Sequence, residues 1–397
     1  MDLSFAGIRI RQARMDRGWS QEGLCRGICA VSYLSKIEQG KVSAGGDILR
    51  LLFERLDVRW YGDEAHVQQS ARLSEQFYEM LFLAYDGRAF EHMRAAFIAH
   101  QELLFNGPYG LDGLLMAQFL AEENARAPLD PQWEPFLNRK QLALQRILQQ
   151  RMTEAIGLWP CAYTYMEAGS AAYISGDNYS TALEYLQKAY DLAADGGYVH
   201  MMMRSRTLMG NCYSNLLDYV QMQSHYAVAL RLARALGDSQ EQQSIEYNTA
   251  STALELGNIT YAYDYFSSLE DPSPMALHKL AICCEKLGKR REAFDALARI
   301  QTADEPLFDG TLLEGMCDLV RFRLEHPDYL QHEAYGQMLL ECFASCRASL
   351  PIGYAVFHLP WVLEWYTAAR QYKQAFELLR EFPIRLPVNP ADGGGVH

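Results

Sequence analysis

The chain has 397 residues, of which 49% are hydrophobic, 21% are charged and 12% are aromatic, and its formal net charge at pH 7 is −13. This apolar and aromatic content excludes an intrinsically disordered chain, and the length allows more than one domain. No stretch reaches the roughly 18 apolar residues that a membrane-spanning helix needs, and the N-terminal segment lacks the apolar core of a secretory signal. We therefore expect a soluble, cytoplasmic protein.

Charge is distributed unevenly along the chain. Residues 1–60 contain ten Arg or Lys residues and seven acidic residues, a balance of +3, so the remaining 337 residues carry −16. An acidic surface repels the phosphates of nucleic acid, whereas a basic one attracts them. A basic head before an acidic body is therefore typical of a protein that contacts nucleic acid at one end only.

Four helices are predicted in the head. The first begins near residue 6, repeats apolar residues at the spacing of one helical face, and ends at Gly18. Ser20 is the predicted N-cap of a second, short helix over residues 21–27. A third helix, over residues 31–39, directs Leu34 and Ile37 inward. The fourth lies within residues 45–58, and its predicted buried face consists of Ile48, Leu51, Leu52 and Leu56.

The second and third helices carry the sequence SQEGLCRGICAVSYLSKIEQGK, which follows RQARMDRGW. These segments resemble the helix-turn-helix of phage-repressor-like (XRE-type) regulators. The short link between the helices and the ending S-K-I-E-Q-G are similar to the RRNPP family of peptide-responsive regulators. The resemblance implies an all-α fold, in which a five-helix lambda-repressor-like domain binds double-stranded DNA and tetratricopeptide repeats follow it.

The resemblance also implies which residues face DNA: Gln21, Val31, Ser32, Tyr33, Lys36 and Lys41. Gln21 and Lys41 would bind backbone phosphates, while the third helix would lie in the major groove and Lys36 would donate to guanine. Val31 departs from the polar residue that is usual at its position. Alternatively, Ser32, Tyr33 and Lys36 form only the solvated face of a helix. In similar domains an ion pair joins the positions of Arg14 and Glu38, which we expect to pair here.

Beyond residue 65 a tetratricopeptide pattern recurs. Segment 203–236 fits the pattern without a gap and segment 162–195 fits with one inserted residue, and further copies lie near residues 250–266, 281–297 and 366–379. Small residues such as Gly210 let paired helices approach, and aromatic residues such as Tyr226 fill the space between hairpins, so we assign both to the core. Segments 66–160 and 305–350 are helical in period but match poorly. The prediction is a right-handed superhelix of hairpins.

The first helix of each hairpin would line the concave side of this superhelix. The positions that we predict to bind a peptide there are Tyr173, Arg204, Thr207, Asn211, Asn215, Tyr247, Asn248, Ser251 and His278. Asn side chains offer a donor and an acceptor that match the N–H and C=O of an extended peptide, and aromatic residues form pockets for its side chains. Asn211 and Asn215 are one helical turn apart. Taken singly, each Asn is better explained as a solvated or capping amide, and only the group along one groove favours peptide binding.

Motifs of enzyme chemistry are absent from the sequence. It contains no G-x-x-x-x-G-K-[ST] loop, no G-x-S-x-G elbow and no H-E-x-x-H helix. Its nine cysteines include no C-x-x-C pair, and His326 and His332 lack convincing carboxylate partners in the sequence. We therefore expect no enzyme activity, no metal and no cofactor.

The RRNPP resemblance implies how these parts work together. Residues 1–65 would bind DNA, residues 66–385 would bind a short signalling peptide and form a homodimer, and residues 386–397 would be a flexible tail rich in Pro and Gly. The expected function is a transcription regulator that a peptide controls. The alternative is a regulator whose repeats hold a protein partner instead of a free peptide.

Overall fold

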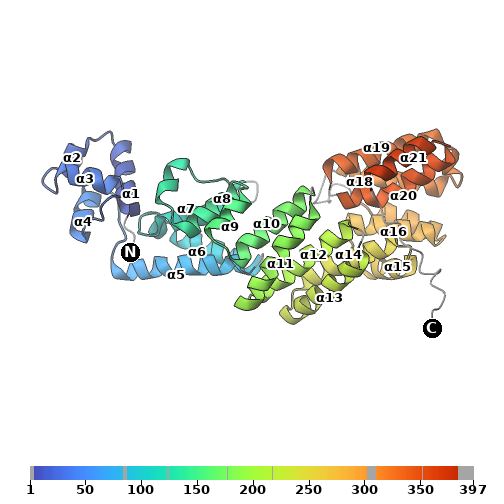
Figure 1. The fold of residues 1–397 in the computed structure, drawn as a ribbon, viewed down its shortest axis with the longest axis horizontal. Helices are drawn as coiled ribbons and strands as arrows, with labels where there is room; N and C mark the ends of the chain where they lie inside the picture. Colours follow the sequence, from blue (N-terminus) through green and yellow to red (C-terminus); the bar gives the residue numbers. More distant parts are fainter. Residues whose placement is uncertain are drawn as a thin grey trace. The chain divides into compact units, whose positions relative to one another are not determined.

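The computed structural model describes residues 4–83, 87–122, 125–176, 178–216, 218–301, 310–350 and 352–382. Within these ranges the regular elements are α-helices and short 3-10 helices, so the predicted all-α fold is confirmed (Figure 1). None of the described helices is long and apolar enough to span a membrane. The predicted tail, residues 386–397, lies outside the described residues. The chain divides into two compact units: Met1–Ala171 with Glu184–Ser205, and Ala172–Leu183 with Arg206–His397.

The head contains the four predicted helices: α1 (Ser4–Asp16), α2 (Gln21–Cys25), α3 (Val31–Glu38) and α4 (Gly46–Arg55). Ser20 caps α2 as predicted, because its Oγ accepts a hydrogen bond of 3.0 Å from the amide of Gly23. The predicted buried face of α4 was partly wrong. Leu51 is 39% exposed, and α4 buries Leu49, Leu52 and Phe53. Phe53 turns inward because it stacks on Trp60, with 4.5 Å between the ring centroids.

The predicted ion pair of Arg14 with Glu38 is present and joins α1 to α3. Arg14 donates from Nε to Oε1 (2.6 Å) and from Nη2 to Oε2 (2.9 Å) of Glu38. Its Nη1 also donates to the carbonyl of Trp19 at 2.7 Å, and Gln21 donates to Glu38 Oε2 at 2.8 Å. The side chains of Arg14 and Glu38 are only 13% and 2% exposed. The bidentate contact and the bond from Gln21 together link α1, α2 and α3 at a part-buried site.

The first unit continues with α5 (Glu64–Leu81), α6 (Gly87–Phe105), α7 (Gly110–Phe119), η2 (Pro131–Phe136), α8 (Arg139–Leu148) and α9 (Met152–Leu158). The N-terminal turn of α1 packs on this region. Phe5 lies 6.1 Å from Trp133 of η2 between ring centroids, and a Cβ atom at Gly110 would fall 1.9 Å from the Phe5 ring. Arg9 donates to the side chain of Asn106 at 3.2 Å. These contacts join the head to the helices that follow it.

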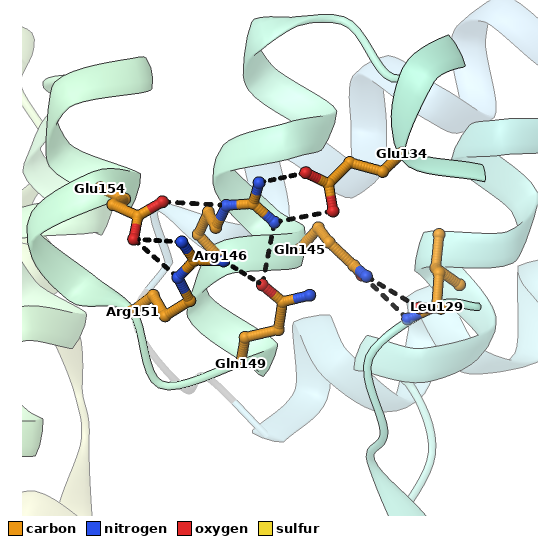
Figure 2. A network of polar contacts seen from close by, with 7 residues as sticks. All are labelled: Leu129, Glu134, Gln145, Arg146, Gln149, Arg151 and Glu154. Atoms are coloured by element: carbon orange, nitrogen blue, oxygen red, sulfur yellow. Dashed lines mark hydrogen bonds and ion pairs between the residues drawn. The ribbon is translucent and has the colours of Figure 1, made fainter. Parts of the chain in front are cut away.

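A polar network joins η2 and the residue Leu129 before it to α8 and α9 (Figure 2). The fully buried amide of Gln145 exchanges two hydrogen bonds of 2.9 Å with the backbone of Leu129. Arg146, which is also buried, forms an ion pair with Glu134 of η2. Its Nε atom lies 3.3 Å from Oε2 of Glu154 in α9. Because buried polar groups must be paired, this network ties the segment before α8 firmly to α8 and α9.

Helical hairpins occur where the repeats were predicted. Their helices are α10 (Ala162–Ser175), α11 (Tyr179–Gly196), α12 (Val199–Asn215), α13 (Tyr219–Leu236), α14 (Ser239–Glu255), α15 (Ile259–Ser268), α16 (Pro274–Lys286), α17 (Arg290–Ala298), α20 (Ile352–Ala368) and α21 (Tyr372–Glu381). Gly257 and Gly288 end α14 and α16 with positive φ angles of 83° and 73°, a conformation that favours glycine. The poorly matching segment 305–350 holds α18 (Gly310–Glu325), η4 (Tyr329–Gln331) and α19 (Glu333–Ser349).

The buried ion pair of the head allows a direct test of its contribution to stability. Glu38→Ala leaves the nearly buried Arg14 guanidinium without its carboxylate, and we expect the free energy of unfolding of the head to fall by about 3 kcal/mol. Hydrogen exchange of the α1 and α3 amides measures this loss. The matched control is Glu54→Ala, which breaks the exposed pair with Arg50 (3.0 Å) and should cost less than about 1 kcal/mol. An equal decrease in the free energy of unfolding in the two variants would contradict a stabilising role for the buried Arg14–Glu38 pair.

Candidate functional site

The outer face of α3 is one of two candidate sites. Val31 is 42% exposed, Ser32 and Lys36 are exposed on the same helix, and Lys41 is exposed just after it. No side chain caps the start of α3, where Ala30 is the N-cap residue. The first amides of a helix without such a cap favour an anion. This face of α3 therefore combines an uncapped helix start at Val31 with exposed lysines in its last turn and just beyond its C-terminal end.

Two residues predicted to face DNA also have structural contacts within the head. The Gln21 side chain donates its amide to Glu38, and Tyr33 is half-buried and packs against the head core. Glu38 Oε2 accepts the bond from Gln21 in addition to the one from Arg14, and the Tyr33 ring covers apolar surface between the helices. The freely exposed part of the predicted face is Val31, Ser32, Lys36 and Lys41.

The second candidate site is a cavity of about 260 Å³ in the second unit. Its walls come from the end of α10 and from α12, α13, α14, α16 and the start of α20. Six residues predicted from the repeat pattern line it: Tyr173, Asn211, Asn215, Tyr247, Asn248 and Ser251. The residues that the sequence did not predict are Ser214, Tyr226, Thr252, Glu255, Lys279, Gly353, Tyr354, Val356 and Phe357.

Three other predicted residues do not line the cavity. Thr207 is 1% exposed and His278 is fully buried, and Arg204 belongs to the first unit. The prediction extended one helix face along the whole of α12, whereas only the C-terminal half of α12 borders the cavity. His278 is covered because α18 packs against α16. Burial lowers the pKa of His278 well below its ordinary value, so this imidazole is neutral and part of the core.

Asn211 is the centre of the hydrogen bonds within the cavity. Its Oδ1 accepts a bond of 2.6 Å from the Tyr226 hydroxyl and a bond of 3.4 Å from Asn248 Nδ2. Tyr226 was predicted as core only, and its ring does pack in the core at 4% exposure, but its hydroxyl reaches the cavity wall. Since the carbonyl oxygen of Asn211 has these two donors, its Nδ2 group is the part that can serve a ligand.

The start of α20 forms the wall opposite α12. A Cβ atom at Gly353 would lie 2.9 Å from Oδ1 of Asn215, so glycine permits this close approach. Tyr354, Val356 and Phe357 follow on the same helix and line the cavity. A pattern read along one hairpin cannot reveal that a helix about 140 residues later in the chain closes the site.

One basic and one acidic residue, Lys279 and Glu255, line the cavity. Lys279 is 7% exposed, and its Nζ lies 3.2 Å from the centroid of the Phe357 ring. Burial lowers the pKa of Lys279 to about 8, although the nearby Glu255 partly offsets this shift. Burial likewise raises the pKa of Glu255, and Lys279 opposes that shift. Each group therefore reduces the cost of keeping the other charged inside the protein.

The lowered pKa of Lys279 predicts a specific pH dependence of stability. Because the folded pKa lies below the ordinary value of 10.5, the unfolded chain binds more protons between about pH 8 and pH 10, and folding becomes more favourable as pH rises there. Urea unfolding should show that this gain, about 2 kcal/mol, is lost in Lys279→Met. Subtracting the two profiles removes the titration of other groups. The exposed Lys188→Met is the control, and it should keep the wild-type profile; the same result for Lys279→Met would refute the assigned pKa.

Comparisons with known proteins add the following. No curated protein matches the chain. Among solved structures, it is similar to a Rap protein complexed with competence and sporulation factor, with 16% identity, a TM-score of 0.48, and coverage of 80% of this chain and 97% of that one. It is also similar to PlcR from Bacillus thuringiensis in complex with the peptide PapR7 and DNA, with 15% identity, a TM-score of 0.30, and coverage of 60% and 98%.

The match to a family model lies in the head. Residues 10–61 match the helix-turn-helix family, and this range covers α2, α3 and α4 together with most of α1. The matched residues include both partners of the Arg14–Glu38 ion pair and every residue predicted to face DNA. The head of this protein is therefore a helix-turn-helix domain.

Proposed function

We propose that this protein is a cytoplasmic transcription regulator that binds DNA through residues 1–65 and a short signalling peptide through residues 66–385, which also form a homodimer. The observation that carries the proposal is the combination of a helix-turn-helix head with a separate cavity lined by amide, hydroxyl and aromatic groups. This combination matches what the RRNPP resemblance of the head motif implies.

The chemistry of the head supports DNA as its ligand. Its basic balance of +3 stands against −16 in the rest of the chain, so phosphates are attracted to this end. Lys36 and Lys41 are exposed at the end of α3 and just after it, while Val31 and Ser32 are exposed at its start. A homodimer would place two such helices in successive major grooves, about 34–36 Å apart.

The peptide proposal rests on the donors and acceptors inside the cavity. Asn211 offers Nδ2, and Asn215, Asn248 and Ser251 add amide and hydroxyl groups on the same wall. Such groups pair with the backbone of an extended peptide, and Tyr247 and Phe357 supply apolar surface for its side chains. The cavity volume of about 260 Å³ suits only part of a short peptide. Glu255 adds a carboxylate to the cavity wall, and this negative charge favours a cationic group on that part.

DNA binding by α3 is tested with the full-length protein. A binding site is first selected from random duplexes, and the affinity of each variant for that site is then measured over a range of salt concentrations. Lys36→Ala should weaken binding by about 1–3 kcal/mol if Lys36 donates to a guanine. Lys188→Ala, which removes an exposed lysine from α11, is the matched control and should leave the affinity unchanged. Unaltered affinity and salt dependence in Lys36→Ala would rule out this face.

Peptide binding is tested by mass spectrometry and calorimetry. A peptide that copurifies with the protein from its native host is identified, synthesised and titrated into the purified protein. The double variant Asn211→Ala and Asn215→Ala should lose detectable binding while keeping the helical circular dichroism of the wild type. Asn258→Ala is the control, because Asn258 is exposed and makes no capping bond at the start of α15.

Two outcomes would contradict the peptide proposal. Wild-type affinity in the double variant would exclude the cavity as the binding site. Copurification of a stoichiometric polypeptide, with no short peptide in the mass spectrum, would favour the alternative in which the repeats hold a protein partner.

A further inference from the structure

We propose that the connector between α18 and α19 is a binding site for a divalent transition-metal ion of the zinc type, held by His326, Asp328 and His332. One ligand atom from each of these residues lies within 4.8 Å of the other two. The sequence offered no convincing carboxylate partner for the two histidines, and the folded connector supplies Asp328. This inference is independent of the proposed function, since none of the three residues lines the cavity or belongs to the head.

The backbone of the connector is held by a series of hydrogen bonds. The amide of His326 donates to the carbonyl of Phe322 at 2.9 Å, and the amide of Tyr329 donates to the carbonyl of His326 at 2.9 Å. The amide of His332 donates to the carbonyl of Tyr329 at 3.1 Å, and that of Tyr335 donates to the carbonyl of His332 at 3.1 Å. The segment that carries the three ligands is therefore preorganised, so a metal ion need not order a flexible loop.

The ligand atoms have nearly the spacing that a metal ion requires. His332 Nε2 lies 3.1 Å from Asp328 Oδ1. Two ligands of a tetrahedral zinc ion are about 3.3 Å apart, given metal–ligand bonds of about 2.0 Å. The imidazole centroids of His326 and His332 are 5.1 Å apart, and the Phe322 ring packs against both. The third ligand atom, a ring nitrogen of His326, lies within 4.8 Å of a ligand atom from each of the other two residues.

The chemistry of the ligands selects the class of metal. Two imidazole nitrogens and one carboxylate oxygen suit zinc and similar first-row ions, whereas calcium and magnesium prefer oxygen ligands alone. The Asp328 side chain is 56% exposed, so an ion can reach its carboxylate from solvent, whereas the Nε2 atom of His332 is buried and makes no hydrogen bond within the described residues. The exposed carboxylates of Glu325 and Glu333 flank the connector in the sequence and add negative charge. The fourth ligand is then water or a donor from another molecule.

A bound ion would link the end of α18 to the start of α19. Because the unfolded chain does not bring the three ligands together, binding favours the folded unit and should raise its melting temperature. The test uses the full-length protein, freed of metal with a chelator, and titrates it with zinc chloride in a calorimeter and with cobalt chloride in a spectrophotometer. We expect one saturable zinc ion per chain and a cobalt spectrum of a nitrogen–oxygen site.

Variants of the three ligand residues test whether they hold the zinc ion. His326→Ala combined with His332→Ala should weaken zinc binding more than about 100-fold, because loss of even an outer-shell partner costs about 10- to 100-fold. Asp328→Asn keeps the size of the side chain and should also weaken zinc binding. The matched control is His66→Ala, since His66 pairs with Asp63 on the surface but no third ligand is described beside it.

Circular dichroism checks that each variant retains the wild-type fold, because His326 and His332 are half-buried and pack on Phe322. The proposal is overturned if the double-histidine variant binds zinc as tightly as the wild type, which would place the ion on the cysteines or elsewhere. It is also overturned if the wild type shows no saturable binding.

Discussion

The close approach of paired helices is the constraint on which the second unit depends. A Cβ atom at Gly210 would fall 2.3 Å from the Tyr226 ring, so only glycine lets α13 pack this tightly on α12. This contact has two consequences. It closes the hairpin, and it brings the Tyr226 hydroxyl to Asn211, which orients an amide in the cavity. The packing of one hairpin thus sets the geometry of the candidate peptide site, and the start of α20 approaches Asn215 at Gly353.

The first unit depends on polar contacts to a greater extent. Arg14 and Glu38 join three helices of the head, and the network around Gln145 and Arg146 holds the segment that bears Trp133. Phe5 then packs on Trp133, so α1 is shared between the head core and the helices that follow it. Because α1 is tied to both, packed side chains join the head to the helices that follow it.

Local patterns determined much of this architecture. Ser20, the left-handed glycines and the apolar spacing marked the helices of the head to within one or two residues, because caps and periodicity act within a single helix. The repeat pattern placed the hairpins, because each hairpin is one local unit that stacks on its neighbours. The motif also implied the Arg14–Glu38 pair. The same patterns wrongly predicted that Leu51 is buried, because Phe53 packs on Trp60 and a different face of α4 is buried.

The sequence by itself thus determined an all-α chain, a basic helix-turn-helix head, the approximate bounds of the head helices and six of the residues in the cavity wall. Only the tertiary structure decided that α20 closes the cavity, that Lys279 and Glu255 lie inside it and that α18 buries His278. It also decided that Asp328 joins His326 and His332. The physical reason is that capping and periodicity act over a few residues, whereas a cavity or a cluster of ligands requires elements whose positions depend on packing across the whole unit.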